Sequence, residues 1–396
     1  MKEFEISSEN KDVILALGAE SAGNFSAYKN GTIYFSEDFG DLLVEANFKK
    51  YKQKLNNFLR KDKIKPEIIL SDLHPLFHTT LLAEKLAKKY KAKHMSVQHH
   101  LAHILSAIGD ESLRAKSYKL KADFIGIACD GTGYSEDETV WGGEILKISK
   151  SKCQISNQIH VQRIGHLEHQ ALLGRELAIK EPARILIGVI NKFSILNSQF
   201  PINSQSSISK NKKDLAYKLV KKYYSKQHFE VLWNQVQQKF NCIETSSTAR
   251  ILDAVSVLLE FSKNESLRKH GPIALLEKNS SVPYKLSPVV EFNEKEEIFV
   301  LKTTPLFEYL IKNLHKDKKR LAATAQQYIA NGLFQILQNT KYDIQNTYFS
   351  GGMANNKIIS SFLESKGIYT SKKIPRGDAG ISFGQIFYYL LANSRD

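Results

Sequence analysis

The sequence has little cysteine and no long apolar run, and these absences exclude several classes of protein. Its three cysteines, Cys129, Cys153 and Cys242, form no CxxC pair, so a zinc ribbon is excluded and a disulfide framework is not expected. No stretch approaches the roughly 20 apolar residues of a membrane span. The polar N-terminus contains no signal-peptide apolar region. The sequence therefore predicts a soluble, cytoplasmic protein with reduced thiols.

Length and charge set the next limits. With 396 residues, 42% of them apolar, the chain is long enough for two domains with ordinary cores. Its 56 basic and 41 acidic residues leave a net charge of +15, which attracts nucleic acid, nucleotides, phosphates or an acidic partner. The basic residues are dispersed, with the densest run from Lys210 to Lys222, so a lysine excess that serves solubility is the favoured explanation. Nucleic acid and membranes are therefore not the expected partners.

Strand-like and helix-like segments alternate along the first half, which predicts an α/β class. In the second half, a buried strand over 124–129 ends in a turn at 130–133, and the region of about 168–285 is mostly helical. Residues 203–214 are rich in serine and lysine and predict an exposed loop or insertion. The expected strands are 13–18, 24–35 (a hairpin), 67–71, 95–97, 139–148, 158–164, 296–304 and 346–349, and the expected helices are 49–60, 79–90, 99–108, 324–338 and the last one from 381.

Two histidines four residues apart are the strongest candidates for a metal site. A spacing of four puts His99 and His103 on one helix face, one turn apart, as a shared metal requires. With 100° per residue, the apolar stripe from Leu101 to Ile108 is centred roughly 190° from His99, so the pair points away from it. This orientation argues against a core histidine pair, although a solvated or structural pair remains open.

Two glycine-rich segments follow strands and suit a phosphate or nucleotide. Asp130-Gly131-Thr132-Gly133 allows a close approach of backbone N–H groups to a phosphate, and its carboxylate can hold a cation. Ser350-Gly351-Gly352, with Asn356 after it, admits a base or ribose against bare backbone. A plain turn explains either segment as well.

Two further aspartates are candidates. Asp378 precedes the last helix and is either an N-cap or a carboxylate ligand. Asp253 lies off the apolar face of a helix that the hydroxyl run 245–248 caps, so it is either solvated or available to a ribose hydroxyl.

Taken in order, these motifs resemble the C-terminal, carbamoyl-transferring domain of the hydrogenase-maturation carbamoyltransferases (HypF), nearly end to end. Besides the serine-rich segment around Asp253, the motifs are Ala16-Leu17-Gly18-Ala19-Glu20, Ser71-Asp72-Leu73-His74-Pro75, Val97-Gln98-His99-His100-Leu101-Ala102-His103, Asp130-Gly131-Thr132-Gly133-Tyr134, Trp141-Gly142-Gly143-Glu144, Glu181-Pro182-Ala183-Arg184, Ser350-Gly351-Gly352 and Asp378-Ala379-Gly380-Ile381-Ser382.

The resemblance implies a two-lobed actin-like ATPase (ASKHA) fold, shared with tRNA threonylcarbamoyl transferases and antibiotic O-carbamoyltransferases, with nucleotide and metal in the cleft between the lobes. The expected lobes are 1–119 and 120–396, with the helical insertion at about 168–285 in the second and the last helix as a candidate to return to the first. The implied metal ligands, for iron or zinc, are His99, His103, Asp130 and Asp378, of which the first three form the catalytic centre. The implied nucleotide contacts are Gly131, Thr132, Asp253, Gly351, Gly352 and Asn356.

The same resemblance implies the reaction. A carbamoyl group moves from carbamoyl-adenylate, made from carbamoyl phosphate and ATP, to the C-terminal cysteine of a HypE-like protein in nickel–iron hydrogenase maturation. The acylphosphatase, zinc-finger and adenylate-forming domains of HypF are not in this sequence, so either another protein supplies the adenylate or the chain is an excised or separate unit.

Two departures from the family pattern lie near the expected cleft and keep a small-molecule acceptor open. Leu172-Leu173-Gly174-Arg175 replaces a Pro-Gly-Gly stretch, and Ala249 replaces a glycine. A tRNA threonylcarbamoyl transferase, which would explain the net charge, and a non-catalytic nucleotide-binding scaffold stay open as well.

Overall fold

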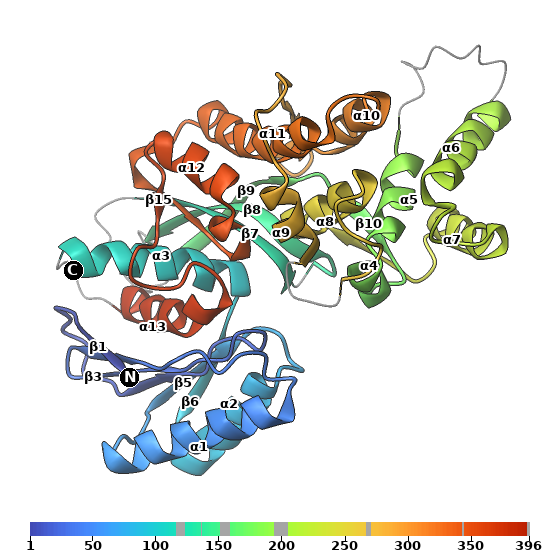
Figure 1. Ribbon diagram of the computed structural model, residues 1–396. Helices are drawn as coiled ribbons and strands as arrows, with labels where there is room; N and C mark the ends of the chain where they lie inside the picture. Colours follow the sequence, from blue (N-terminus) through green and yellow to red (C-terminus); the bar gives the residue numbers. More distant parts are fainter. Residues whose placement is uncertain are drawn as a thin grey trace.

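The computed structural model describes residues 1–115, 123–135, 137–150, 159–193, 205–266, 271–342 and 344–393. Two β-sheets form its framework, and two helices, α3 (His99–Ala115) and α13 (Ile381–Ala392), lie between them (Figure 1). The expected lobe boundary at 119 and 120 falls outside the described residues, as does Cys153. None of the described helices combines the length and the apolarity that a membrane crossing requires.

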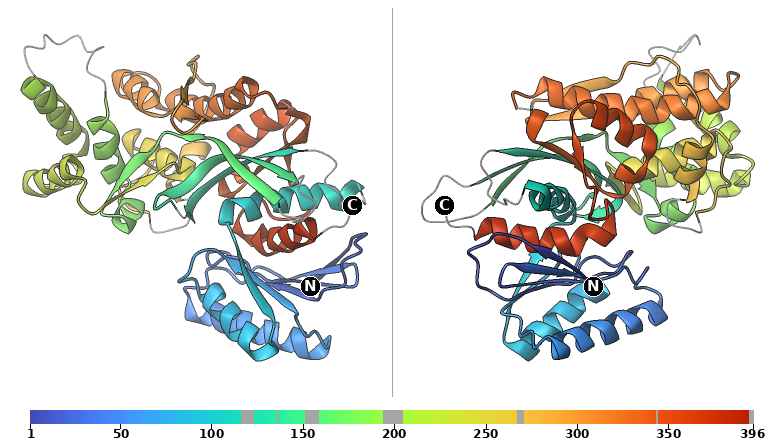
Figure 2. Two further views of the ribbon diagram at one scale, coloured as in Figure 1. Left: turned by 180° about the vertical axis from the view of Figure 1, so that it is seen from behind. Right: turned by 60° about the vertical axis from the view of Figure 1, so that its left-hand side comes forward.

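The first sheet has six strands in the order β1-β4-β3-β2-β5-β6. Strands β2, β5 and β6 are parallel, and β3 and β4 form the predicted hairpin. All five residues of β5 are buried, because α1 and α2 cover one face of the sheet and α13 packs on the other (Figures 1 and 2). The bounds are β1 (Lys2–Glu5), β2 (Ile14–Ala16), β3 (Ser26–Lys29), β4 (Thr32–Phe35), α1 (Glu45–Lys61), β5 (Ile68–Asp72), α2 (His78–Tyr90) and β6 (Lys93–Val97).

The second sheet follows the order β12-β13-β9-β8-β7-β14-β15, and β11 pairs with both β8 and β10. Strands β7, β14 and β15 are parallel, so their carboxyl ends meet at one edge of the sheet. The bounds are β7 (Phe124–Tyr134), β8 (Val140–Lys150), β9 (Ile159–Leu167), β10 (Gln170–Leu173), β11 (Cys242–Thr245), β12 (Val289–Asn293), β13 (Ile298–Lys302), β14 (Thr347–Ser350) and β15 (Tyr369–Thr370).

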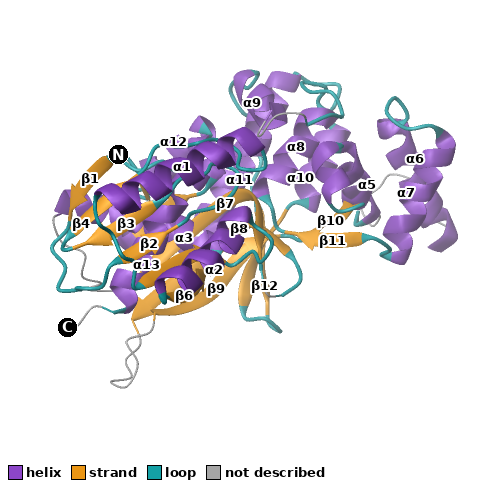
Figure 3. Ribbon diagram, turned by 90° about the horizontal axis from the view of Figure 1, so that it is seen from below, coloured by secondary structure: helices purple, strands orange, loops and turns teal. Residues whose placement is uncertain are grey.

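The other helices lie around the second sheet. Helices α11 and α12 are on the side opposite α3, and α5, α6 and α7 gather at the end of β10 and β11, away from the first sheet (Figures 1 and 3). The bounds are α4 (Glu176–Lys180), α5 (Ala183–Asn191), α6 (Gln205–Val220), α7 (Lys226–Gln238), α8 (Thr248–Leu258), α9 (Gly271–Lys278), α10 (Thr304–Lys312), α11 (Lys318–Asn339) and α12 (Lys357–Ser365).

Each of the two central helices packs on the sheet that does not precede it in the chain. Helix α3 follows β6 of the first sheet but packs on β7 and β14 of the second, whereas the C-terminal α13 packs on β2, β3 and β5 of the first. The helices also pack closely on each other: a Cβ at Gly384 would lie 1.8 Å from the carbonyl oxygen of Ala102. Residues far apart in the sequence therefore meet where these two helices begin.

Two local expectations were wrong. Residues 205–214 belong to helix α6, not to a loop, because the buried Ala216 and Val220 at helical spacing anchor a helix that extends back through the polar stretch. Residues 203 and 204 lie outside the described part of the chain. The segment 130–133 is not a turn either, because β7 continues to Tyr134 with an irregular register between Cys129 and Gly133, as in a β-bulge.

Candidate metal centre

The histidine pair lies at the start of α3, directly after β6. His99 and His103 are 3% and 0% exposed, and their ring centroids are 4.8 Å apart. The apolar side of α3, with Ile104 and Leu105, packs on the second sheet. The imidazoles are thus buried on the other side of the helix, which excludes a solvated pair.

Two carboxylates from distant parts of the chain meet the imidazoles. Asp130 of β7 has its Oδ2 3.3 Å from His99 Nε2 and 3.1 Å from His103 Nε2. Asp378, directly before α13, has its Oδ1 3.8 Å and 3.4 Å from the same two nitrogens. One ligand atom from each of the four buried residues lies within 4.8 Å of all the others. Two imidazoles and two carboxylates suit zinc or iron, so the donor set fits the implied metal.

A fifth residue, which the sequence did not single out, supports the centre from behind. The Oδ2 of Asp72, at the end of β5, lies 2.6 Å from Nδ1 of His99. An acceptor on Nδ1 fixes the ring so that Nε2 points toward a metal. Asp72 could have been found from its place at the carboxyl end of a buried parallel strand, beside the strand that leads into the histidine helix.

Charge is balanced inside the centre. Burial favours the neutral form of His99, but Asp72 and Asp130 more than offset this effect and hold the pKa of His99 well above its usual value. Burial would likewise raise the pKa of Asp130, yet its hydrogen bonds with His103 and His99 hold that pKa well below the usual value. The site therefore concentrates carboxylate charge that a cation can neutralise.

The first lobe also holds Asp378 directly. Ser21, in the loop after β2, donates a short hydrogen bond to Oδ2 of Asp378, and the Asn24 amide donates another to the carbonyl oxygen of Ala379. The N–H of Gly18 donates to Oε1 of Gln385 in α13, at 3.0 Å. These bonds attach the start of α13 to the first sheet, so both sheets contribute to the centre.

The predicted glycines lie beside Asp130. The N–H of Gly352 donates to Oδ1 of Asp130 at 3.2 Å. Gly351 has φ +98°, and a Cβ there would lie 2.2 Å from the carbonyl oxygen of Cys129, so only glycine fits. Ser247 donates from Oγ to the carbonyl oxygens of Asp130 and Gly131, at 3.0 and 2.5 Å. The N-terminus of α8 therefore contacts the first glycine segment.

Asp253 is buried in α8, one turn beyond Arg250. Its Oδ2 is 3.1 Å from Nη1 of Arg250, but neither oxygen accepts a hydrogen bond from the described residues. Burial raises the pKa of Asp253 to about 6, an effect that Arg250 only partly opposes. Arg250 also connects this region to the first glycine segment, because a Cβ at Gly131 would lie 3.4 Å from Nη2 of Arg250.

The raised pKa of Asp253 should make the free energy of unfolding depend on pH. The pKa of Asp253 is about 6 in the fold and about 4 in the unfolded chain, so the folded state binds more protons between these values. The stability of the wild type relative to Asp253→Asn should therefore fall by about 3 kcal/mol as the pH rises from about 4 to above 6. Urea unfolding of both proteins at pH 4.5, 5.5 and 7.5 measures the difference, and a constant difference would contradict the raised pKa.

Two of the predicted nucleotide contacts, Thr132 and Asn356, do not lie against Asp130 as the glycines do. Thr132 is exposed at the bulge of β7, where its hydroxyl is accessible. The side chain of Asn356 is used within the fold: Oδ1 accepts from the N–H of Ile359 at 3.1 Å as the N-cap of α12, and Nδ2 donates to Oε1 of Gln326 at 2.7 Å. The structure therefore brings Gly351 and Gly352 to Asp130, leaves Thr132 accessible and Asp253 buried beside Arg250, and gives Asn356 a capping role.

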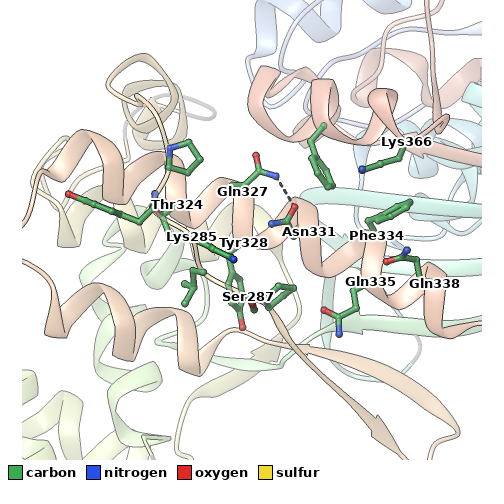
Figure 4. Close-up of a pocket in the computed structure, with 15 residues that line it drawn as sticks. Lys285, Ser287, Thr324, Gln327, Tyr328, Asn331, Phe334, Gln335, Gln338 and Lys366 are labelled. Atoms are coloured by element: carbon green, nitrogen blue, oxygen red, sulfur yellow. Dashed lines mark hydrogen bonds between the residues drawn. The ribbon is translucent and has the colours of Figure 1, made fainter.

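A pocket of about 670 Å³ lies elsewhere, between α11, α12 and the segment 283–288 (Figure 4). Aromatic and amide side chains line it, and Gln327 donates a hydrogen bond to Asn331 within it, at 2.8 Å. None of the predicted site residues is among its lining residues. The pocket is therefore separate from the metal centre.

Comparisons with known proteins place this geometry in a family. Residues 9–110 match the family described as "HypF Kae1-like domain", and residues 126–385 match "Carbamoyltransferase, Kae1-like Domain, second subdomain". The "Probable carbamoyltransferase HypF" of Methanocaldococcus jannaschii is 32% identical over 98% of this chain and 48% of its own length. A "Carbamoyltransferase HypF homolog" of Cupriavidus necator is 26% identical over 94% of this chain and 90% of its own length.

A solved structure agrees with these relatives. The crystal structure of full-length HypF in the phosphate- and nucleotide-bound form has a TM-score of 0.80 and 26% identity, and the match covers 98% of this chain and 47% of that one. The chain thus spans about half the length of the M. jannaschii relative and of the crystallised HypF. The predicted two-lobed actin-like fold is confirmed. Because both subdomains match and the M. jannaschii relative is 32% identical over 98% of this chain, the chain belongs to the HypF carbamoyltransferase family.

Proposed function

We propose that the chain transfers a carbamoyl group from carbamoyl-adenylate to the C-terminal cysteine of a HypE-like protein. The observation that carries the proposal is the convergence of His99, His103, Asp130 and Asp378, all buried, beside the glycine pair 351–352. In the transfer, the cysteine thiolate, having lost its proton to solvent, forms a bond from sulfur to the carbamoyl carbon, the bond from that carbon to the phosphate oxygen breaks, and AMP leaves.

The residues of the centre have distinct parts in this proposal. His99, His103, Asp130 and Asp378 would hold a divalent iron or zinc ion, and Asp72 orients His99. When bound, the ion would polarise the carbamoyl carbonyl and offset the negative charge that develops on its oxygen. Burial of all four ligands keeps water from the reacting group, which limits hydrolysis of the adenylate.

The nucleotide part of the substrate is proposed to lie along the glycine segments. Gly131, Gly351 and Gly352, which carry no side chains, let its phosphate approach the backbone, the hydroxyl of Thr132 donates to it, and Asp253 accepts from a ribose hydroxyl. Two observations support this arrangement: Asp253 is buried without a hydrogen-bond donor among the described residues, and the crystallised HypF is a phosphate- and nucleotide-bound form. The adenylate is proposed to be made by an adenylate-forming protein or domain.

Intact-mass spectrometry tests the transfer. The purified chain, loaded with Fe²⁺ or Zn²⁺, is incubated with carbamoyl-adenylate and a HypE-like protein that ends in cysteine. We expect the acceptor to gain the mass of one carbamoyl group. The same acceptor with its last cysteine changed to serine is the control and should stay unmodified.

Three results would overturn the assignment of the acceptor. They are an adduct on the serine control, release of AMP with no adduct on the protein, and, in parallel reactions, transfer to a small hydroxyl compound or transfer of a threonylcarbamoyl group from threonylcarbamoyl-adenylate to tRNA. The last result would favour an O-carbamoyltransferase or a tRNA threonylcarbamoyl transferase. No AMP release and no adduct in any reaction would favour a scaffold.

A further inference from the structure

A buried carboxylate on α3 has no part in the centre described above. Asp110 is 0% exposed and lies two turns beyond His103 on the same helix. It accepts four hydrogen bonds, one from β15 and three from the segment between β15 and α13, which lies beside α3 in Figure 1. The donors are the hydroxyl of Tyr369 at 2.7 Å and the backbone N–H groups of Lys372, Lys373 and Ile374 at 2.8, 2.8 and 2.6 Å.

The segment held in this way leads directly to a ligand of the centre. Asp378 follows Ile374 by four residues, which span at most about 14 Å even when extended. On α3, the seven residues from His103 to Asp110 correspond to about 10 Å along the helix axis. The maximum length of this four-residue segment is therefore only slightly greater than the distance along α3 that it has to cover. Anchoring Ile374 at Asp110 limits where Asp378 can meet His103.

Further contacts fix how the segment that contains Asp378 is aligned along α3. A Cβ at Gly380 would lie 2.8 Å from Oγ of Ser106, so the chain after Asp378 passes closely over the middle of α3. In the same segment, the carbonyl oxygen of Arg376 accepts from the N–H of Gly351 at 2.9 Å. The segment thus runs antiparallel to α3 and contacts the glycine pair on its way to the centre.

We infer that Asp110 is a positioning residue that sets the place of Asp378 in the metal centre. One rigid helix then carries two ligands, His99 and His103, and also holds the segment that delivers a third. The charge of Asp110 matters, because a carboxylate accepts three N–H groups whereas a carboxamide in its place directs an NH₂ group at some of them. The inference rests on the proposed metal centre.

Titration with Co²⁺ alone tests the inference, since Co²⁺ reports its ligand geometry in the visible spectrum. For Asp110→Asn we expect about tenfold weaker Co²⁺ binding and a changed visible spectrum, the size of effect seen when groups outside the ligand shell are lost. Glu111→Gln is the matched control: Glu111 is the next residue of α3 and accepts a hydrogen bond from a tyrosine, Tyr348, in β14. This control should bind Co²⁺ within about twofold of the wild type.

The outcomes separate a positioning role from a merely structural one. Wild-type affinity and spectrum in Asp110→Asn would overturn the inference, as would equal weakening in Glu111→Gln. If Asp110→Asn does not fold, Tyr369→Phe, which removes one donor, should bind Co²⁺ about two- to threefold more weakly, and unchanged binding would overturn the inference. Failure of the wild type itself to bind Co²⁺ more tightly than His103→Ala would instead overturn the metal centre.

Discussion

Changing His103 to alanine is expected to remove the metal and to stop carbamoyl transfer. The imidazole of His103 is fully buried and lies within 3.4 Å of both carboxylates of the centre, so its loss leaves two acidic groups with only His99 between them. We expect metal content to fall at least about tenfold and the transfer rate by about 10³-fold, the range for loss of a group that stabilises the transition state electrostatically. Elemental analysis of the purified protein and the mass assay measure the two effects.

The matched control is an exposed histidine remote from the centre. His315, in the turn after α10, is exposed and belongs to none of the motifs, so His315→Ala should keep both metal and activity. Full carbamoyl transfer by His103→Ala would show that the buried cluster is structural. If the variant keeps its metal but loses transfer, then other residues bind the metal and His103 acts in the reaction in another way.

The second large effect is expected for Asp72→Asn. Asparagine has nearly the same shape and can still accept from Nδ1 of His99, but it carries no charge and holds the ring less firmly. Loss of such a group behind a metal ligand typically costs about 10- to 100-fold in metal affinity, and we expect this range here. Competition with a coloured chelator measures the affinity, and thermal unfolding without metal shows whether the fold is intact.

Another carboxylate–histidine pair of the first lobe serves as its control. Oε1 of Glu20 is 2.8 Å from Nδ1 of His78, but His78 is no part of the metal cluster. Glu20→Gln should therefore leave metal affinity within about twofold of the wild type. Equal losses of metal affinity in both variants would mean that a carboxylate anywhere in the first lobe affects the centre. Asp72 would then have no specific role in orienting His99.

The features predicted correctly are those that depend on residues close together in the sequence. The spacing of four and the apolar stripe of α3 predicted which side of the helix His99 and His103 occupy, because helical geometry repeats every few residues. The same approach failed at 203–214, where local polarity hid a helix that buried residues further along the chain hold in place. It also failed at 130–133, because two glycines in a strand-ending segment suit a turn and a bulge equally well.

The motif series, read as a resemblance, predicted the actin-like fold and the pairing of Asp378 with two histidines that lie 275 and 279 residues earlier in the sequence. No local pattern contains that pairing, because it depends on α13 returning to the first sheet while α3 crosses to the second. Asp72 went unassigned for the same reason: a lone aspartate at the end of a strand has no visible partner until β5 and β6 are side by side.

The sequence by itself determined the local elements, the candidate ligands and, through their order, the family. Tertiary structure alone decided that the histidines are buried, that Asp72 supports one of them, that Asn356 caps a helix, and that Asp110 holds the segment leading to Asp378. The physical reason is the distance along the chain over which each effect acts. Helical periodicity and turn chemistry act over a few residues, whereas a metal centre built from β6–α3, β7 and the start of α13 exists only after both sheets have packed against the same pair of helices.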